Sequence, residues 1–286
     1  MSKQGCKIDT RANKSVIALA IAAVIGASAP AFAQNEDLGL IKDGFITVAA
    51  TASFPPIVSV DASGNYVGID ADIIEAIAKE LGLGVNWVNI KFDGIIPGIS
   101  AGRFDVGMTG ITDTVERQQA VDFVNYANVG SGMIVAKGNP KGIKTIGDIC
   151  GLTVASQTGD LATTYAKRQS DSCVAEGRPA VTVNEFPEAT QSMLQLRGGR
   201  ADLIIHDYPL SAYKVQQSEG ALDLAGEQFS AAPYGMAISK GRDGLEHALV
   251  KGLDAIIASG EYGRILQKYD VSGIAIEKAT VNAASK

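Results

Sequence analysis

Short apolar runs alternate with stretches of helical periodicity along most of the chain. Runs rich in Val, Ile and aromatic residues, bounded by turn residues, are typical of strands. We expect strands at residues 45–50, 85–90, 105–109, 133–137, 152–157, 181–186, 201–206 and 234–240. Apolar residues recur at helical spacing in residues 73–81 and 245–257. This alternation predicts an α/β fold in which mainly parallel strands are flanked by helices.

Two stretches rich in small residues, 128–134 and 230–235, each run into a predicted strand. We interpret them as candidate crossings between two lobes, although ordinary loops have a similar composition. The tail after Asp270 is polar and Ala-rich without periodicity, so we expect it to be loosely held.

The N-terminus has the pattern of a secretory signal peptide. Residues 1–14 carry four basic side chains and one acid, an apolar run follows at residues 15–26, and Ala31-Phe32-Ala33 forms a small-residue cleavage site. The alternative, a membrane anchor, requires about 20 apolar residues, and this run is shorter. The pattern predicts cleavage after Ala33 and a periplasmic protein.

Loss of residues 1–33 leaves two cysteines, Cys150 and Cys173. In a secreted protein such a pair predicts a disulfide, and without a histidine cluster it makes a poor metal site. His206 and His247 are far apart in the sequence, and we interpret them as structural or surface residues. The net charge of −6 becomes more negative without the basic N-terminus, which argues against nucleic acid as a partner.

The sequence lacks the common motifs of catalysis. It has no phosphate-binding loop, no dinucleotide-binding glycine pattern, no G-x-S-x-G and no H-E-x-x-H. Nothing in the residue pattern therefore demands an enzyme or a cofactor.

Five segments carry a resemblance to a known family. They are residues 68–81, 92–98, 109–117, 156–159 and 206–209. In order and spacing they resemble the bacterial extracellular solute-binding proteins of the polar amino acid family, family 3. Ala71 departs from the pattern, since a larger aliphatic residue or Thr is usual there.

The resemblance implies a two-lobed periplasmic-binding-protein fold of type II. Lobe one would comprise residues 34–131 and 234–270, lobe two residues 132–233, and residues 271–286 a C-terminal tail. It also implies the monomeric substrate-binding component of an ABC importer, which closes on a free amino acid and delivers it to the membrane permease. It implies no catalysis and no cofactor.

A buried amino acid needs an opposite charge at each end, because removing its two charges from water is costly. Arg117 offers a planar fork that matches a carboxylate, and the resemblance assigns it that role. The alternative is a solvated arginine on a helix. Asp207 ends a predicted strand, where α/β sheets bind ligands, and its carboxylate suits the ammonium. The alternative for Asp207 is a helix cap.

The resemblance adds further contacts around these two residues. They are the hydroxyls of Thr112 and Thr158, the backbone N–H groups near Gly159, the carbonyl of Gly110, and an aromatic pair, Phe54 and Phe92, which would sandwich the ligand side chain. Plain core packing remains an alternative for both aromatic residues.

Four positions near the expected ligand side chain carry no charge: Thr51, Phe54, Phe92 and Gln157. In family members that bind basic ligands, an acidic residue lies three positions before the first cleft aromatic, and Thr51 occupies that position here. The sequence therefore predicts an amino acid with a neutral side chain, polar or moderately apolar.

Two other functions compete with this interpretation. The first is a dehydratase-like enzyme on the same fold, with Asp160 or Asp207 as general acid toward a small carboxylic acid. The second is the ligand-binding domain of a sensory receptor. Because the sequence ends at Lys286 without a membrane-spanning helix, we expect a free binding protein rather than a receptor.

Overall fold

The computed structural model describes residues 38–284, and the predicted signal peptide lies outside them. The described strands form one nine-stranded sheet in the order β5-β1-β6-β11-β7-β10-β8-β9, with β12 paired to β7, and a small sheet β2-β3-β4. The bounds in the large sheet are β1 (Phe45–Ala50), β5 (Gly84–Asn89), β6 (Val106–Gly107), β7 (Val121–Ala136), β8 (Thr153–Gln157), β9 (Thr182–Phe186), β10 (Leu203–Asp207), β11 (Leu222–Ser239) and β12 (Thr280–Val281). The small sheet comprises β2 (Ser53–Phe54), β3 (Val58–Val60) and β4 (Tyr66–Val67).

The predicted α/β fold is confirmed, and its sheet is mixed. Strand β1 pairs in parallel with β5 and β6 at one end, and β8 pairs in parallel with β9 and β10 at the other. Between these groups, β7 and β11 pair antiparallel with each other and with their neighbours. The parallel arrangement expected from the sequence therefore holds at each end but not in the centre.

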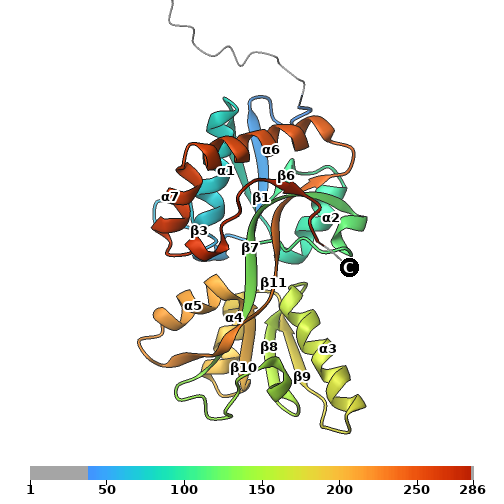
Figure 1. Cartoon of the computed structure of the whole chain (residues 1–286), viewed down its shortest axis with the longest axis vertical. Helices are drawn as coiled ribbons and strands as arrows, with labels where there is room; N and C mark the ends of the chain where they lie inside the picture. Colours follow the sequence, from blue (N-terminus) through green and yellow to red (C-terminus); the bar gives the residue numbers. More distant parts are fainter. Residues whose placement is uncertain (1–37, 285–286) are drawn as a thin grey trace, which may run out of the picture. The chain divides into compact units, whose positions relative to one another are not determined.

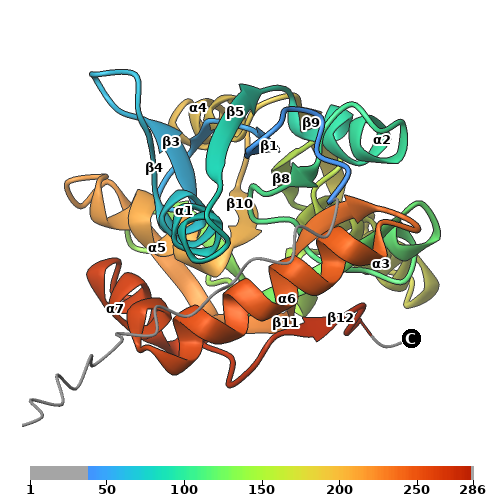
Figure 2. The ribbon, with the colours of Figure 1, turned by 90° about the horizontal axis from the view of Figure 1, so that it is seen from above.

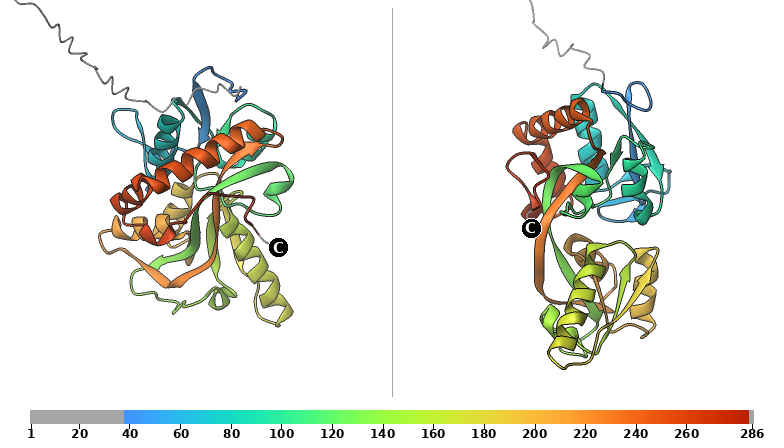
Figure 3. Two further views of the ribbon diagram at one scale, coloured as in Figure 1. Left: turned by 45° about the horizontal axis from the view of Figure 1, so that its top comes forward. Right: turned by 90° about the vertical axis from the view of Figure 1, so that its right-hand side faces the viewer.

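Strands β7 and β11 run through both groups of strands (Figure 1). They are 16 and 18 residues long, far longer than the strands predicted there. Both candidate crossings, 128–134 and 230–235, lie inside them. The sequence concealed this continuity because small residues interrupt the β-branched pattern. The pairing of β11 with β7 shifts register between Ala225 and Phe229, between Phe229 and Ala232, and between Tyr234 and Gly235. Figure 3 shows the two strands side by side from two directions.

The helices cover the two ends of the sheet. They are α1 (Ile69–Glu80), α2 (Ile95–Ser100), α3 (Leu161–Ala175), α4 (Ala189–Arg197), α5 (Tyr208–Gln216), α6 (Asp243–Ala258) and α7 (Glu261–Lys268), together with 3₁₀ turns η1 (Phe92–Gly94), η2 (Arg117–Gln119), η3 (Ile146–Ile149) and η4 (Ser272–Ile274). The apolar stripes predicted in α1 and α6 are buried in one core with β1, and Figure 2 shows α6 alongside α1. Strands β7 and β11 contribute side chains to this core and to a second core, so they connect the two.

The second core gathers around Val154, Ile205 and the fully buried Cys173. Cys173 is bonded to Cys150, with 5.7 Å between their Cα atoms, which confirms the predicted disulfide. The bridge ties α3 to the end of η3, so it braces the region that carries β8, β9 and β10.

The C-terminal tail is held on the sheet, so the expectation of a loose tail was wrong. β12 pairs with β7 through Thr280 and Val281. The Asn282 side chain accepts a hydrogen bond from the Phe123 N–H at 2.9 Å, and the Ala279 N–H donates to Asp254 at 2.8 Å. Backbone pairing with β7 holds the end of the tail, and Ile274, Ile276 and Ala279 pack on the core around α1.

Candidate functional site

Arg117 begins η2 and connects two segments that are distant in the sequence. Its guanidinium donates to the Thr112 carbonyl at 2.6 Å and to the Gly159 carbonyl at 2.9 Å. Burial lowers the pKa of Arg117, and the charges of Asp160 and Asp207 oppose that shift. Because a guanidinium has five N–H donors, these two bonds leave donors for a carboxylate. Arg117 is therefore not the solvated surface arginine of the alternative interpretation.

Thr112 and Thr158 lie on the two segments that Arg117 connects. Thr112 is buried and forms an isolated bridge with Tyr234 of β11. Thr158 directly follows β8, and its N–H donates to the Phe186 carbonyl at 2.8 Å. Gly159, next to it, has a left-handed φ of 80° and lies against Phe92 and Asp93, where a Cβ atom would come within 3.8 Å of both. The left-handed φ favours glycine there, whereas a contact of 3.8 Å would be an ordinary one for a Cβ atom.

Asp207 lies at the carboxyl end of β10 and is 7 % exposed. It precedes α5, but its side chain caps none of that helix's N–H groups, so the capping alternative does not account for it. Burial and the nearby Asp160 carboxylate raise the pKa of Asp207 well above its usual value, while Tyr234 and Arg117 act in the opposite direction. Such a carboxylate gains from a cation placed beside it.

Asp160 and His206 form a buried pair next to Asp207. The Asp160 side chain accepts from the Ala162 N–H at 3.2 Å at the start of α3, and its other oxygen lies 3.1 Å from His206 Nδ1. His206 is fully buried, and His247 is exposed, as the sequence indicated. Both carboxylate oxygens of Asp160 therefore have structural partners, which argues against Asp160 as a catalytic acid.

Gly110 is held in place by Asp70, a residue that sequence reasoning placed only at a helix start. Asp70 accepts from the Gly110 N–H at 2.7 Å and from the Tyr126 hydroxyl at 2.7 Å. Burial raises the pKa of Asp70 to about 7. Gly68 permits this arrangement, because any Cβ atom there would come within 2.3 Å of the Ile57 carbonyl oxygen.

The two aromatic residues differ in environment. Phe54 is 5 % exposed, belongs to the core around α1, and points its ring edge-on to His206 with 6.3 Å between centroids. Phe92 is half-buried, and the Arg117 guanidinium lies over its ring at 5.7 Å, within range of a cation–π interaction. Phe54 belongs to the core around α1, and Phe92 packs against the core around Ile95 while it lies beside the Arg117 guanidinium.

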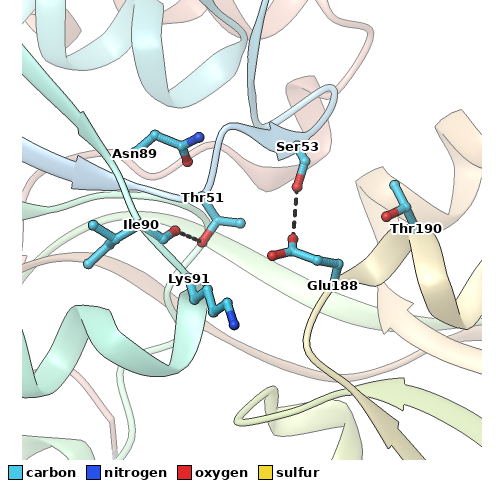
Figure 4. Close-up of a pocket in the computed structure, with 7 residues that line it drawn as sticks. All are labelled: Thr51, Ser53, Asn89, Ile90, Lys91, Glu188 and Thr190. Atoms are coloured by element: carbon cyan, nitrogen blue, oxygen red, sulfur yellow. Dashed lines mark hydrogen bonds between the residues drawn. The ribbon is translucent and has the colours of Figure 1, made fainter.

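A hollow of about 430 Å³ opens beside Thr51 (Figure 4). Residues 89–91, Thr51 and Ser53 line one side, and Glu188 and Thr190 line the other. The Thr51 hydroxyl donates to the Ile90 carbonyl at 3.1 Å, and the Ser53 hydroxyl donates to Glu188 at 3.1 Å. Gln157 is buried, and its amide donates to the carbonyl of Pro187, the residue before Glu188, at 3.2 Å.

Sequence reasoning missed the charged residues of this hollow, Lys91 and Glu188. Lys91 immediately precedes Phe92, and Glu188 immediately precedes α4. Glu188 forms a capping box with Gln191 at the start of α4. This common role gave no sign that Glu188 also lines the hollow. Lys91 adjoins the recognised segment 92–98, whereas Glu188 lies next to none of the five recognised segments, so no signal in the sequence pointed to it.

Neither a metal cluster nor a membrane span is found in residues 38–284. No group of three or more metal-binding side chains gathers there, and no helix there is long and apolar enough to cross a bilayer.

Residues 46–272 match the family model of the bacterial extracellular solute-binding proteins, family 3. The chain belongs to this family. It is 32 % identical to the arginine-binding protein ArgT of Corynebacterium glutamicum, over 85 % of this chain and 80 % of that protein. It is 27 % identical to the L-cystine-binding protein TcyJ of Escherichia coli K12, over 88 % of this chain and 92 % of that protein.

Among solved structures, the fold matches an ancestral arginine-binding protein bound to glutamine. The TM-score is 0.73, with 33 % identity over 80 % of this chain and 99 % of that one. Family 3 consists of non-catalytic proteins that bind solutes outside the cytoplasmic membrane. The chain is therefore an amino-acid-binding protein of an ABC transporter, in a family of non-catalytic extracellular solute-binding proteins, which favours a binding protein over the dehydratase interpretation.

Proposed function

We propose that this chain binds one free L-amino acid with a neutral side chain, between two lobes that close on it. Lobe one comprises residues 34–131 and 234–270, and lobe two comprises residues 132–233. β7 and β11 are the two connections between them. The observation that carries the proposal is the Arg117 side chain, which reaches from Thr112 to the Gly159 carbonyl across the proposed lobe boundary.

In this proposal the two charges of the ligand meet opposite charges. Arg117 binds the carboxylate with the donors that its two backbone bonds leave, and Asp207 binds the ammonium. The raised pKa of Asp207 supports this role, because a cation there relieves its repulsion with Asp160. Thr112, Thr158, the N–H groups near Gly159 and the Gly110 carbonyl complete the hydrogen bonds, and Phe54 and Phe92 flank the side chain.

Closure links binding to transport. Each ligand charge is fully satisfied only when both lobes contribute, so the ligand favours the closed form. The closed form presents a surface different from the open one, and we propose that a membrane permease recognises it. The protein acts as a monomer in this account.

The first experiment is a thermal-shift screen of the purified protein against the twenty amino acids. A ligand that binds only the native state raises the midpoint in proportion to RT ln(1 + [L]/Kd). We expect neutral amino acids to give the largest shifts and Arg, Lys, Asp and Glu smaller ones. A largest shift with a charged amino acid would contradict the neutral assignment, and no shift with any of them would contradict amino acid binding.

Localisation has a separate prediction. We propose that residues 1–33 are a cleaved signal peptide and that the mature periplasmic protein begins at Gln34, after the A-x-A site. Intact mass measurement of the protein released from the periplasm should match a chain that starts at Gln34. A mass that includes residues 1–33 would contradict the prediction.

A further inference from the structure

The hollow beside Thr51 contains opposite charges from two sides. Glu188 enters it from the start of α4, and Lys91 enters it from the loop before η1 (Figure 4). No ion pair within 4.0 Å joins their side chains, so the two charges face the hollow without neutralising each other directly.

The hollow adjoins the proposed amino acid site. Thr51 borders it and is itself linked to the ligand-binding segment, because its N–H donates to the Thr109 hydroxyl at 3.2 Å. Gln157 and Pro187 connect β8, on the Thr158 side, to Glu188. A side chain that leaves an amino acid held by Arg117 and Asp207 and passes Thr51 therefore enters this space.

The fixed groups around the hollow decide which side-chain ends are favoured. The Thr51 hydroxyl is used by the Ile90 carbonyl, so it offers its methyl group to the hollow (Figure 4). Glu188 accepts from the Ser53 hydroxyl at 3.1 Å and, in its capping box, from the Gln191 N–H, and a carboxylate with about four lone-pair sites keeps acceptor capacity beyond these two bonds. Lys91 supplies donors and no acceptor. A cationic end is attracted by Glu188 and repelled by Lys91. An anionic end is attracted by Lys91 and repelled by Glu188.

We propose that this hollow is the subsite for the end of the ligand side chain and that Glu188 and Lys91 select a long side chain with no net charge and with both donors and acceptors. A carboxamide end satisfies this chemistry by donating to Glu188 and accepting from Lys91. A distal amino-acid zwitterion, as in cystine, satisfies it with one charge for each residue. This inference rests on the proposed function and names the substrate class of the same site.

The test compares isosteric ligands in charge-neutralised variants. Calorimetry measures the affinities of L-glutamine, L-glutamate, L-arginine and L-cystine for wild type, Glu188→Gln and Lys91→Gln. We expect wild type to prefer glutamine or cystine over both charged probes. Glu188→Gln should shift the glutamate-to-glutamine affinity ratio toward glutamate at least tenfold. Lys91→Gln should shift the arginine-to-glutamine ratio toward arginine at least tenfold.

L-Glutamine and L-cystine, the two probes without net charge, distinguish a carboxamide end from a distal amino-acid zwitterion. If cystine is the ligand, each substitution should weaken its binding at least tenfold, because each removes one of two ion pairs. If glutamine is the ligand, its own affinity should change less than the charged probes do. Glu80→Gln and Lys79→Gln are matched controls on the exposed surface of α1, where they line a different hollow, and should leave all ratios unchanged.

Opposite shifts in the two variants support the subsite. Ratios that stay within threefold in both variants, or a wild type that binds arginine or glutamate most tightly, overturn it. In those cases the proposed function stands if Arg117→Ala still weakens binding of the tightest ligand at least tens-fold, and it fails if no probe and no other amino acid binds.

Discussion

At the scale of single residues, the charge state of the cleft depends on Asp207. Its carboxylate is buried beside that of Asp160, and this surrounding raises its pKa. In the proposed complex a ligand ammonium beside Asp207 reverses the effect, because an opposite charge favours the ionised form. Asp207 should therefore be protonated more readily without ligand than with it, and ligand binding should release a proton whenever the pH lies below the raised pKa.

We predict that affinity falls as the pH is lowered through the pKa of Asp207 in the unliganded protein. For one linked proton, the affinity falls by at most about tenfold for each pH unit. Above that pKa, affinity should level off, because the carboxylate is already ionised. Calorimetry between pH 5 and 8 in two buffers of different ionisation enthalpy measures the proton release directly.

The matched variants make this measurement specific. Asp207→Asn should bind weakly and lose the linked proton, whereas Asp171→Asn, an exposed change on α3, should keep the wild-type profile. A wild-type affinity that is constant from pH 5 to 8 with no proton release would show that Asp207 does not face the ammonium.

The same scale shows which residues a sequence can reveal. Arg117 and Asp207 stand in recognisable segments, so their candidate roles follow from the pattern. Asp70 occupies the first turn of α1, where acids are common, and its burial depends on Tyr126 and Gly110 from other elements. Glu188 is a helix cap by its local sequence, and only the tertiary fold places it beside Ser53.

At the scale of elements, the C-terminal tail contacts the segment that carries Arg117 in the proposed site. The Ala284 N–H donates to Asp113 Oδ2 at 3.1 Å, and the Ala283 N–H donates to the Asn125 side chain at 3.0 Å. Asp113 is 1 % exposed and lies between Thr112, whose carbonyl holds Arg117, and the turn that leads to Arg117. The residues after β12 therefore hold a buried carboxylate beside the candidate carboxylate-binding residue.

We predict that ending the chain after Ala279 lowers both stability and ligand affinity. Hydrogen bonds to a charged group contribute about 1.5–3 kcal/mol, and Asp113 loses one while β7 loses its pairing with β12. Urea unfolding should show a loss of that order, and calorimetry should show weaker binding of the tightest amino acid. Unchanged stability and affinity would mean that the tail only lies on the surface.

The disulfide is a second element-scale device. Cys150 and Cys173 lie 23 residues apart in sequence and join α3 to η3. Replacing both by Ser should lower the free energy of unfolding by about 3 kcal/mol in the chain-entropy model. Because the bridge lies outside the candidate site, ligand affinity at a temperature well below the unfolding midpoint should stay within threefold. Unfolding that is unaffected by the double change would contradict a stabilising role.

Some strand boundaries follow from the local sequence, and others depend on strand pairing in the fold. β1 was predicted with its observed bounds because its apolar run ends at clear turn residues. β7 and β11 were predicted as short strands, because glycine and serine residues at their centres lower strand propensity. Their mutual pairing supplies the hydrogen bonds that extend them, and a single sequence does not reveal that pairing.

At the scale of the whole molecule, the account depends on charges that two separated segments bring together. Arg117 follows β6 and contacts the Gly159 carbonyl after β8, and Asp207 ends β10. The ligand carboxylate and ammonium are satisfied only when these segments come together. Binding and closure are therefore one event in this account, and the loss of either charged partner should disable both.

The most direct test is the affinity of the tightest amino acid for Arg117→Ala and Asp207→Asn, measured by calorimetry beside the thermal midpoints of the unliganded variants. Removing one partner of a buried charge pair costs about 2–5 kcal/mol, a factor of tens to thousands in Kd. Arg117→Lys should recover only part of the loss, because a point charge does not reproduce the guanidinium fork. Arg168→Ala, on the exposed face of α3, is the matched control. The account predicts a loss of at least tens-fold in affinity for both variants with midpoints near that of wild type. Affinities within threefold of wild type for both would contradict it.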